Sequence, residues 1–584
     1  MRFANNLIHL LARDFLFDKT QYAADVVAFL NALGVVLLAL AVVDETGLGA
    51  WARRRGRPIL AVACLVYLGW CAHRVACYVR ATGIYDHVEA STIAVSWLWA
   101  GHGAPLYHAP DAASRYSNLY GPALFLVDGL FLRAFGPSVF AAKLAGAALW
   151  AAGVALLYLA LRREGPPLLA LAATTYVELC LMLSRGEVSC FCLRVDPHLV
   201  FWSCAGLFAS GLRSRGLAAL GCGVVAGVAV NLKVHGVLYM LPVFALLGQR
   251  HGARAVAGAA AIAALAAASP FVAAPRISLP LYLGRLAGAA RHGLEFETFK
   301  EALAEGAFVA LPAAAALLRL ALDDRRAWRD FLGSNRFLLA AFGAAAALTF
   351  ILASKEGAGS HHLMPLYPSL ALILCRALAQ LASPDAERSW IGRLVKAASL
   401  AFVPMALSTT IATQQKQMGW ERGAEAEAWE VLAEVEAVRG MFPGEGLAIG
   451  YGGNETYTRG NLRCLPVLQG QPYLLDSVAL MDFQQEGHEI SAATREAIRG
   501  GAIPVWLIPA GDEPFTARNF YKPKLPLFDL EFRSTFRRHY SRRLRTKHFD
   551  VWVYGGEPDK AAPPRPQAYR ADGPSGADEH ARWQ

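Results

Sequence analysis

The sequence predicts a polytopic α-helical membrane protein that carries a small α/β domain near its C-terminus. Of its 584 residues, 55% are hydrophobic and only 17% are charged, against about 25% charged in ordinary soluble domains. The mean hydropathy of +0.33 means that the chain has more apolar surface than one folded interior can hide. Several uncharged runs reach about 20 residues, the length that crosses a hydrocarbon layer of ~30 Å. A soluble enzyme, a fibrous protein and a disordered chain are therefore excluded.

Hydrophobic runs of this length predict twelve membrane spans. The connections alternate in character: every second one is a short turn rich in arginine, such as those at Arg162 and Arg213. Basic turns mark the cytoplasmic side of a membrane protein, so the net charge of +10 predicts no nucleic-acid partner. The predicted spans are 24–43, 58–80, 138–161, 166–184, 197–212, 216–231, 235–249, 254–273, 303–321, 337–353, 363–382 and 395–412.

The first outward connection, residues 81–137, is much longer than the others and carries its own amphipathic segments. Residues 87–100 have helical spacing, with Trp97 and Trp99 suited to the membrane interface. Residues 121–135 are apolar but are too short to span easily and contain Asp128. We therefore predict two juxtamembrane helices on the outer surface.

After the last span the pattern changes to alternating short helices and strands. We predict a transmembrane domain over 1–412, an α/β domain over 413–560 and a disordered tail over 561–584. Twelve crossings put the α/β domain on the outer side. Within it we expect helices at 424–439 and 491–499 and strands at 447–451, 503–509 and 549–554.

Ionisable residues gather at the outer ends of four spans that are far apart in the sequence. Charges near a membrane core are costly and usually functional, so this convergence predicts a site. A carboxylate beside cations suits glycosyl transfer from a lipid-linked phosphate: the acid takes a proton from a hydroxyl, and the cations stabilise the departing phosphate. The residues at these ends are Asp86, Glu89, Arg194, Asp196, His198, Lys233, His235, His361 and His362.

Short motifs of the first outer loop resemble those of GT-C glycosyltransferases. They are Tyr85-Asp-His-Val-Glu89, the run from Trp97 to Tyr107, and Tyr116-Ser-Asn-Leu-Tyr-Gly-Pro122, followed by the run from Phe135 to Leu144. The resemblance covers roughly residues 60–412 and is greatest to protein O-mannosyltransferases and the aminoarabinose transferase of lipid A. It implies a polyprenyl-phosphate sugar donor, inversion at the anomeric carbon, and a site on the periplasmic face of a bacterial inner membrane.

The resemblance also implies roles for individual residues. An acid of the first loop would be the base, Asp86 or Glu89, and we favour Asp86 because it directly follows the second span. The acceptor would be a glycan, a lipid or a protein. A divalent cation, Mg²⁺ or Mn²⁺, remains an option because carboxylates and imidazoles suit it. Donor-phosphate ligands would be Lys233, Arg194 and His235, and substrate contacts Asp196, His198, His361, His362 and Tyr120.

Other interpretations remain open. Twelve spans also suit a transporter or flippase of lipid-linked sugars, and the α/β domain suits a non-catalytic subunit of a polysaccharide assembly complex. Asp86 could cap a helix, and Lys233 could extend from a span end to the interface. Glu89 could pair with Arg80 or another cation. Arg74, inside the second span, needs a partner for which Glu178 is a candidate. A disulfide among Cys190, Cys192 and Cys464 is also left open.

Overall fold

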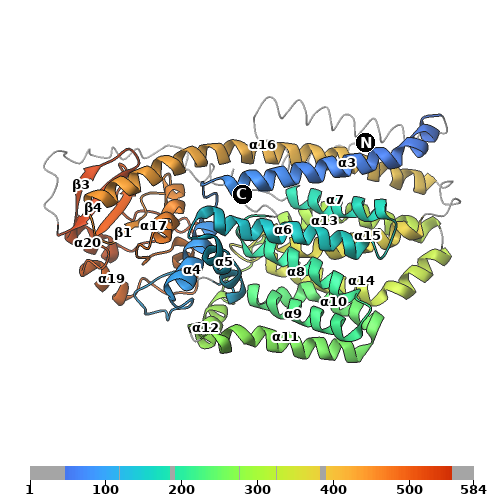
Figure 1. Ribbon diagram of the computed structural model, residues 1–584, viewed down its shortest axis with the longest axis horizontal. Coiled ribbons are helices and arrows are strands. Elements are labelled where there is room, and N and C mark those ends of the chain that lie inside the picture. The colour runs from blue at the N-terminus through green and yellow to red at the C-terminus, as the bar shows by residue number, and fades with distance from the viewer. Residues whose placement is uncertain are drawn as a thin grey trace.

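The computed structural model describes residues 47–116, 119–183, 191–274, 276–323, 325–381 and 390–555. A bundle of long helices lies at one end of the molecule and a domain with a small sheet at the other (Figure 1). Helices occupy every predicted span within the described residues; the first predicted span, 24–43, lies outside them. The bundle helices are α3 (Gly47–Arg80), α6 (Val139–Leu161), α7 (Pro167–Leu183), α8 (Val195–Ser210), α9 (Arg215–Leu232), α10 (Gly236–His251), α11 (Ala253–Ala273), α13 (Phe296–Asp323), α14 (Arg325–Ala353), the 3₁₀ helix η1 (Ser360–Leu366) with α15 (Tyr367–Gln380), and α16 (Trp390–Met441).

Seven helical segments in the described part of the chain are long and apolar enough to cross a membrane by themselves. The predicted multi-pass helical fold is therefore confirmed, whereas the count of twelve stays a prediction. The seven segments are Leu60–Arg80, Val139–Leu161, Arg215–Leu232, Ala253–Ala273, Phe296–Leu322, Arg325–Ala353 and Ser360–Gln380.

The arginine-rich turns come together at the end of the bundle away from the sheet (Figure 1). Arg163 donates a hydrogen bond of 2.8 Å to the carbonyl of Phe208, which joins two of these turns. Glu164 forms ion pairs with Arg250 and with Arg376, the latter at 2.9 Å. The basic turns of α6–α7, α8–α9 and α10–α11 thus share one side, as the alternation of charge predicts.

The helix α16 is continuous over 52 residues and passes through the predicted domain boundary at 412. It runs beside α3 along the bundle and then reaches the sheet domain (Figure 1). The predicted helix at 424–439 is its distal part. Residues 561–584, the predicted tail, lie outside the described residues.

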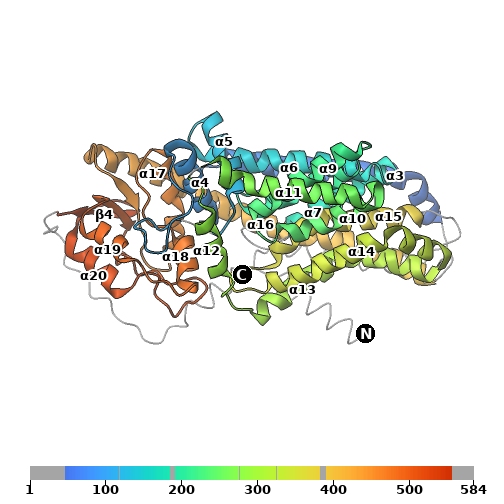
Figure 2. The same cartoon turned by 90° about the horizontal axis from the view of Figure 1, so that it is seen from below.

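The two predicted helices of the first outer loop are present as α4 (His87–His102) and α5 (Pro122–Phe135). Asp86 caps α4 by accepting a hydrogen bond of 3.1 Å from the amide of Val88. The helix ends at Gly103, whose φ of +63° suits a left-handed C-cap. Together with α12 (Leu279–Ala289), these helices lie between the bundle and the sheet domain (Figure 2).

The sheet domain confirms the α/β prediction. Its strands β1 (Leu447–Ile449), β2 (Val505–Pro509), β3 (Tyr540–Arg545) and β4 (Phe549–Tyr554) lie in the order β1-β2-β4-β3. β1 and β2 are parallel, and the other pairs are antiparallel. Around the sheet lie η3 (Tyr457–Arg463), α17 (Cys464–Leu468), α18 (Ser477–Gln485), α19 (Ala492–Arg499) and α20 (Leu530–His539).

Polar contacts join the sheet domain to the bundle side. Arg463 donates a hydrogen bond of 2.8 Å to the carbonyl of His87 and forms an ion pair of 2.9 Å with Asp476. Arg285 of α12 forms a buried ion pair of 2.6 Å with Glu486. The domain is therefore docked where α4 begins. Cys192 and Cys464 are buried free thiols, and Cys190 lies outside the described residues.

Candidate functional site

Asp86 lies between α3 and α4, and its carboxylate forms an ion pair with Arg194, which comes from a connection far away in the sequence. One oxygen is fixed by the α4 cap, and the other lies 2.9 Å from an Nη of Arg194. Arg194 is the N-cap residue of α8, 108 positions further along the chain. The side chain of Asp86 is 3% exposed and that of Arg194 is 12% exposed. The acid is thus almost closed off, while its cation reaches the surface.

A second ion pair lies within electrostatic range of the first, since Arg194 acts on both of its members, Asp196 and Lys233. Lys233, the C-cap residue of α9, places its Nζ 2.7 Å from an oxygen of Asp196. The ring of Tyr120 lies 5.7 Å from the same Nζ. The amide of Gly121 donates a hydrogen bond of 3.0 Å to the carbonyl of Leu232, which holds the loop that contains Tyr120 against the end of α9. Burial lowers the pKa of Lys233, and Asp196 opposes that effect.

Three imidazoles complete the group. His361 Nε2 lies 4.0 Å from Asp196, and its ring contacts that of His362 at 4.8 Å. His362 stacks on His235 with 5.1 Å between ring centroids. The structure thus brings together Asp86, Arg194, Asp196, Lys233, His235, His361, His362 and Tyr120, which we call the rim cluster.

One part of the rim cluster has metal-ligand chemistry. Donor atoms of Asp196, His361 and His362 lie within 4.8 Å of one another. Two imidazoles and a carboxylate suit a divalent transition metal. However, one oxygen of Asp196 is already engaged by Lys233. The donor set fits a metal ion by type, in competition with the lysine.

Glu89 does not join the rim cluster. It accepts hydrogen bonds from the hydroxyl of Tyr78 and, at 3.0 Å, from the amide of Tyr85, so its partners are these tyrosines rather than Arg80. The Nζ of Lys143 lies 4.4 Å from the ring centroids of both tyrosines. It donates a hydrogen bond of 2.6 Å to the carbonyl of Gly83. Burial raises the pKa of Glu89, while the charge of Lys143 acts in the opposite direction. This acid is enclosed.

His198 also lies elsewhere. It is fully buried, and its Nε2 is 3.6 Å from an oxygen of Asp128, which is fully buried on α5. The pair stands between α5 and α8. Although His198 is only two residues from Asp196, the helix turns it toward α5.

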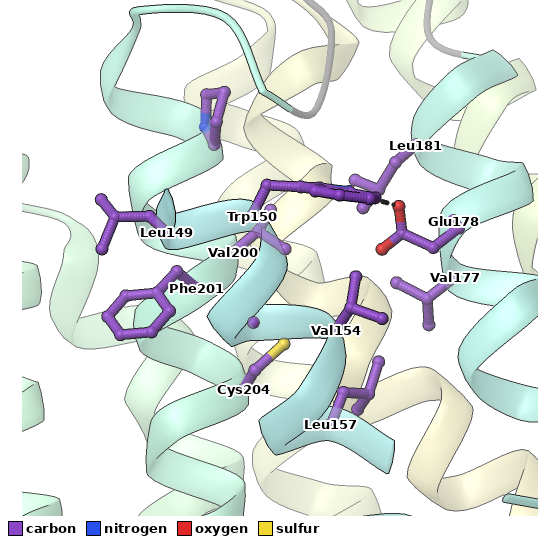
Figure 3. A pocket seen from close by; sticks show the side chains of 12 residues that line it. Leu149, Trp150, Val154, Leu157, Val177, Glu178, Leu181, Val200, Phe201 and Cys204 are labelled. Carbon is purple, nitrogen blue, oxygen red and sulfur yellow. Dashed lines mark hydrogen bonds between the residues drawn. The ribbon is translucent and has the colours of Figure 1, made fainter. Parts of the chain in front are cut away.

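The prediction that Arg74 pairs with Glu178 is wrong. Arg74 forms a buried ion pair of 2.8 Å with Glu421 on α16. Glu178 instead accepts a hydrogen bond of 2.8 Å from the indole N–H of Trp150. Figure 3 shows this bond at the edge of a small, otherwise apolar pocket between α6, α7 and α8. Glu421 thus meets a helix that is distant in the sequence, whereas Glu178 meets the helix directly before its own.

Sequence reasoning missed a set of aromatic residues that the sheet domain brings to the rim cluster. His87, next to Asp86, lies 6.1 Å from the rings of Tyr457 and Phe520. Tyr521 follows, edge-on to Phe520 at 5.6 Å. These residues lie in η3 and in the loop after β2, where no periodic pattern or motif marks them.

Comparisons with known proteins were made by family, by sequence and by structure. No protein-family model and no curated protein matches the chain. Among solved structures, the chain is similar to ArnT from Cupriavidus metallidurans bound to undecaprenyl phosphate, with 14% identity and a TM-score of 0.47 over 85% of this chain and 97% of that one. It is also similar to the Archaeoglobus fulgidus oligosaccharyltransferase tethered with an acceptor peptide, with 11% identity and a TM-score of 0.40 over 84% and 73%. Both are GT-C glycosyltransferases.

Proposed function

We propose that the protein is an inverting membrane glycosyltransferase, which moves a sugar from a polyprenyl-phosphate donor to a hydroxyl of a cell-envelope acceptor. The observation that carries the proposal is the meeting of Asp86 and Arg194 at 2.9 Å beside the pair of Lys233 and Asp196 at 2.7 Å. Three connections far apart in the sequence supply these groups. A base and two cations at one end of an apolar bundle match the needs of a donor with a lipid tail and a phosphate head.

Asp86 is the base in this mechanism. Without substrate, Arg194 neutralises its carboxylate. A donor phosphate competes for Arg194 and Lys233, since guanidinium and ammonium groups bind phosphate oxygens strongly. The oxygen of Asp86 so released accepts the proton of the acceptor hydroxyl.

Bond changes then follow in one displacement. The acceptor oxygen bonds to the anomeric carbon as the bond from that carbon to the phosphate oxygen breaks. The electron pair of the broken bond goes to the polyprenyl phosphate, whose growing negative charge Arg194 and Lys233 stabilise. A single displacement inverts the configuration of the anomeric carbon. We assign this step to Asp86 rather than to Glu89, because the hydroxyl of Tyr78 and the amide of Tyr85 already occupy the Glu89 carboxylate.

The membrane placement is part of the proposal. The arginine-rich turns lie at one end of the bundle, and the sheet domain at the other (Figure 1). The positive-inside rule then assigns the rim cluster and the sheet domain to the outer face, which is the periplasmic face of a bacterial inner membrane.

A divalent cation is a further element of the proposal, and of Mg²⁺ and Mn²⁺ this donor set fits Mn²⁺ better, because imidazole ligands suit transition metals. Asp196, His361 and His362 would hold it. It would supply positive charge to the phosphate when bound. Metal analysis of the purified protein tests this: we expect His361→Ala to lose bound metal, whereas an equal, near-zero metal content in both proteins would contradict it.

The test of the transferase is a direct assay. The full-length protein in lipid nanodiscs is given a panel of polyprenyl-phosphate sugars and envelope extracts as acceptors, and sugar transfer is measured. Asp86→Asn should abolish transfer while the protein stays folded, because asparagine can still cap α4. Asp111→Asn, an exposed acid of the same loop, is the matched control and should keep full activity. Full activity of Asp86→Asn would remove Asp86 as the base.

A further inference from the structure

Four half-buried rings lie beside Asp86, one of whose oxygens is 3.3 Å from Nδ1 of the nearest ring. They are His87, Tyr457, Phe520 and Tyr521, and we call them the ring group. His87 comes from the start of α4, and the other three come from the sheet domain. The contacts of 6.1 Å from His87 to Tyr457 and to Phe520 join the two parts of the molecule.

The ring group differs from the aromatic core of the sheet domain. Trp506, Phe515 and Phe536 form that core and are at most 1% exposed. Tyr457, Phe520 and Tyr521 pack against its margin and keep part of their surface accessible. Stability of the domain alone would favour burying such large rings completely. Their partial exposure beside an ionic cluster is typical of a binding surface.

Charged groups stand within reach of these rings. Arg194, Tyr120 and Asp482 each act electrostatically on the hydroxyl of Tyr521. Asp482 belongs to α18 and is buried, with 6% of its surface exposed. A flat apolar face next to carboxylate and guanidinium groups offers two kinds of contact at once. It can stack on a ring and form charge-assisted hydrogen bonds at that ring's edge.

A pyranose has this pair of properties. Its C–H bonds form an apolar face, and its hydroxyls form a polar edge that both donates and accepts hydrogen bonds. We propose that the ring group is a subsite for a sugar ring of the acceptor, so that the acceptor is a glycan. This inference rests on the proposed function, since it assigns the acceptor hydroxyl that Asp86 deprotonates to a carbohydrate.

Binding of defined saccharides tests the subsite apart from catalysis. The full-length protein in nanodiscs is applied to an array of mono- to tetrasaccharides of rhamnose, galactose, mannose, glucose and N-acetylglucosamine, together with serine- and threonine-containing peptides. We expect binding to saccharides. Phe520→Leu and Tyr521→Leu, which keep an apolar side chain but remove the flat ring, should weaken that binding at least tenfold. Phe520→Tyr should retain it.

Two controls separate the subsite from folding and from the chemistry. Trp429→Ala removes an aromatic ring of α16 that is 57% exposed, and it should leave saccharide binding unchanged. Asp111→Asn, which changes an exposed acid of the first outer loop, should also leave saccharide binding unchanged. The melting temperature of each variant shows whether it has folded.

The outcomes distinguish this inference from the proposed function. Saccharide binding that depends on the ring group, without transfer from any polyprenyl-phosphate sugar, would support the subsite and overturn the transferase. Transfer to peptides, with an acceptor KM that Phe520→Leu leaves unchanged, would overturn the subsite and keep the transferase. Absence of saccharide binding by the wild type would also overturn the subsite.

Discussion

Two groups of buried charges in this protein are built differently. In the bundle, Glu89 is enclosed by two tyrosines, and Arg74 is held by Glu421 and Gln414. In the rim cluster, Arg194 pairs with Asp86, and Lys233 pairs with Asp196. The bundle groups have several fixed partners, which suits a structural role. The rim groups hold partners that an incoming phosphate could replace, which suits binding and chemistry.

The largest expected effect on the transfer rate distinguishes the two acids at the start of α4, Asp86 and Glu89. A general base contributes about 10²- to 10⁴-fold to rate, so Asp86→Asn should lower kcat about a thousandfold. Glu89→Gln should lower kcat less than tenfold but reduce the melting temperature, because Lys143 loses its nearby negative charge. Transfer rates and thermal unfolding of both variants are the measurement. A thousandfold loss in Glu89→Gln with an unchanged melting temperature would reverse the two roles.

The ion pair between Arg74 and Glu421 should matter for stability alone. Removing one partner of a buried pair leaves an uncompensated charge and costs about 3–5 kcal/mol. Glu421→Gln should therefore lower the unfolding free energy by this amount, while the folded fraction keeps its kcat. The double variant Arg74→Met with Glu421→Leu should recover part of the loss. The pair would have a catalytic role if kcat fell in the stable double variant.

An intermediate effect is expected at Lys233. Its ammonium would bind the donor phosphate, so Lys233→Met should raise the KM for the donor about 10- to 100-fold, which corresponds to about 1.4–2.8 kcal/mol. Lys233→Arg keeps the charge and should recover part of the affinity. Initial rates against donor concentration give the result. An unchanged donor KM in Lys233→Met would limit this lysine to stabilising Asp196.

These contrasts also show what the sequence could predict. The rim cluster could be predicted because charges at the outer ends of spans must share one membrane level, whatever the order of the helices. The partner of Arg74 could not, because the choice between Glu178 and Glu421 depends on which helices pack together. His198 was predicted to join the rim cluster, but its position on α8 directs its side chain toward Asp128.

In the sheet domain, too, some elements could not be predicted from the sequence. β3 was missed because its sequence, YSRRLR, has the composition of a solvated basic segment. Its arginines are placed by cross-strand pairing: Arg542 and Arg545 both face Asp550 on β4. The ring group was missed because its members are distant in the sequence and meet only when the domain docks on α4.

The smallest effect should be a pH dependence at the surface where α18 meets α12. Burial raises the pKa of Asp482 to about 7, with Arg285 opposing the shift. The folded protein therefore binds more protons than the unfolded chain between about pH 4 and pH 7, so this residue's contribution to stability falls as pH rises through that window. Asp482→Asn should remove this dependence. The difference in melting temperature between pH 5.5 and pH 8 should shrink by about 2–4 °C. Asp512→Asn, in the same domain, serves as the control. An unchanged difference in Asp482→Asn would mean that the carboxyl is already ionised at pH 5.5, with Arg285 outweighing its burial.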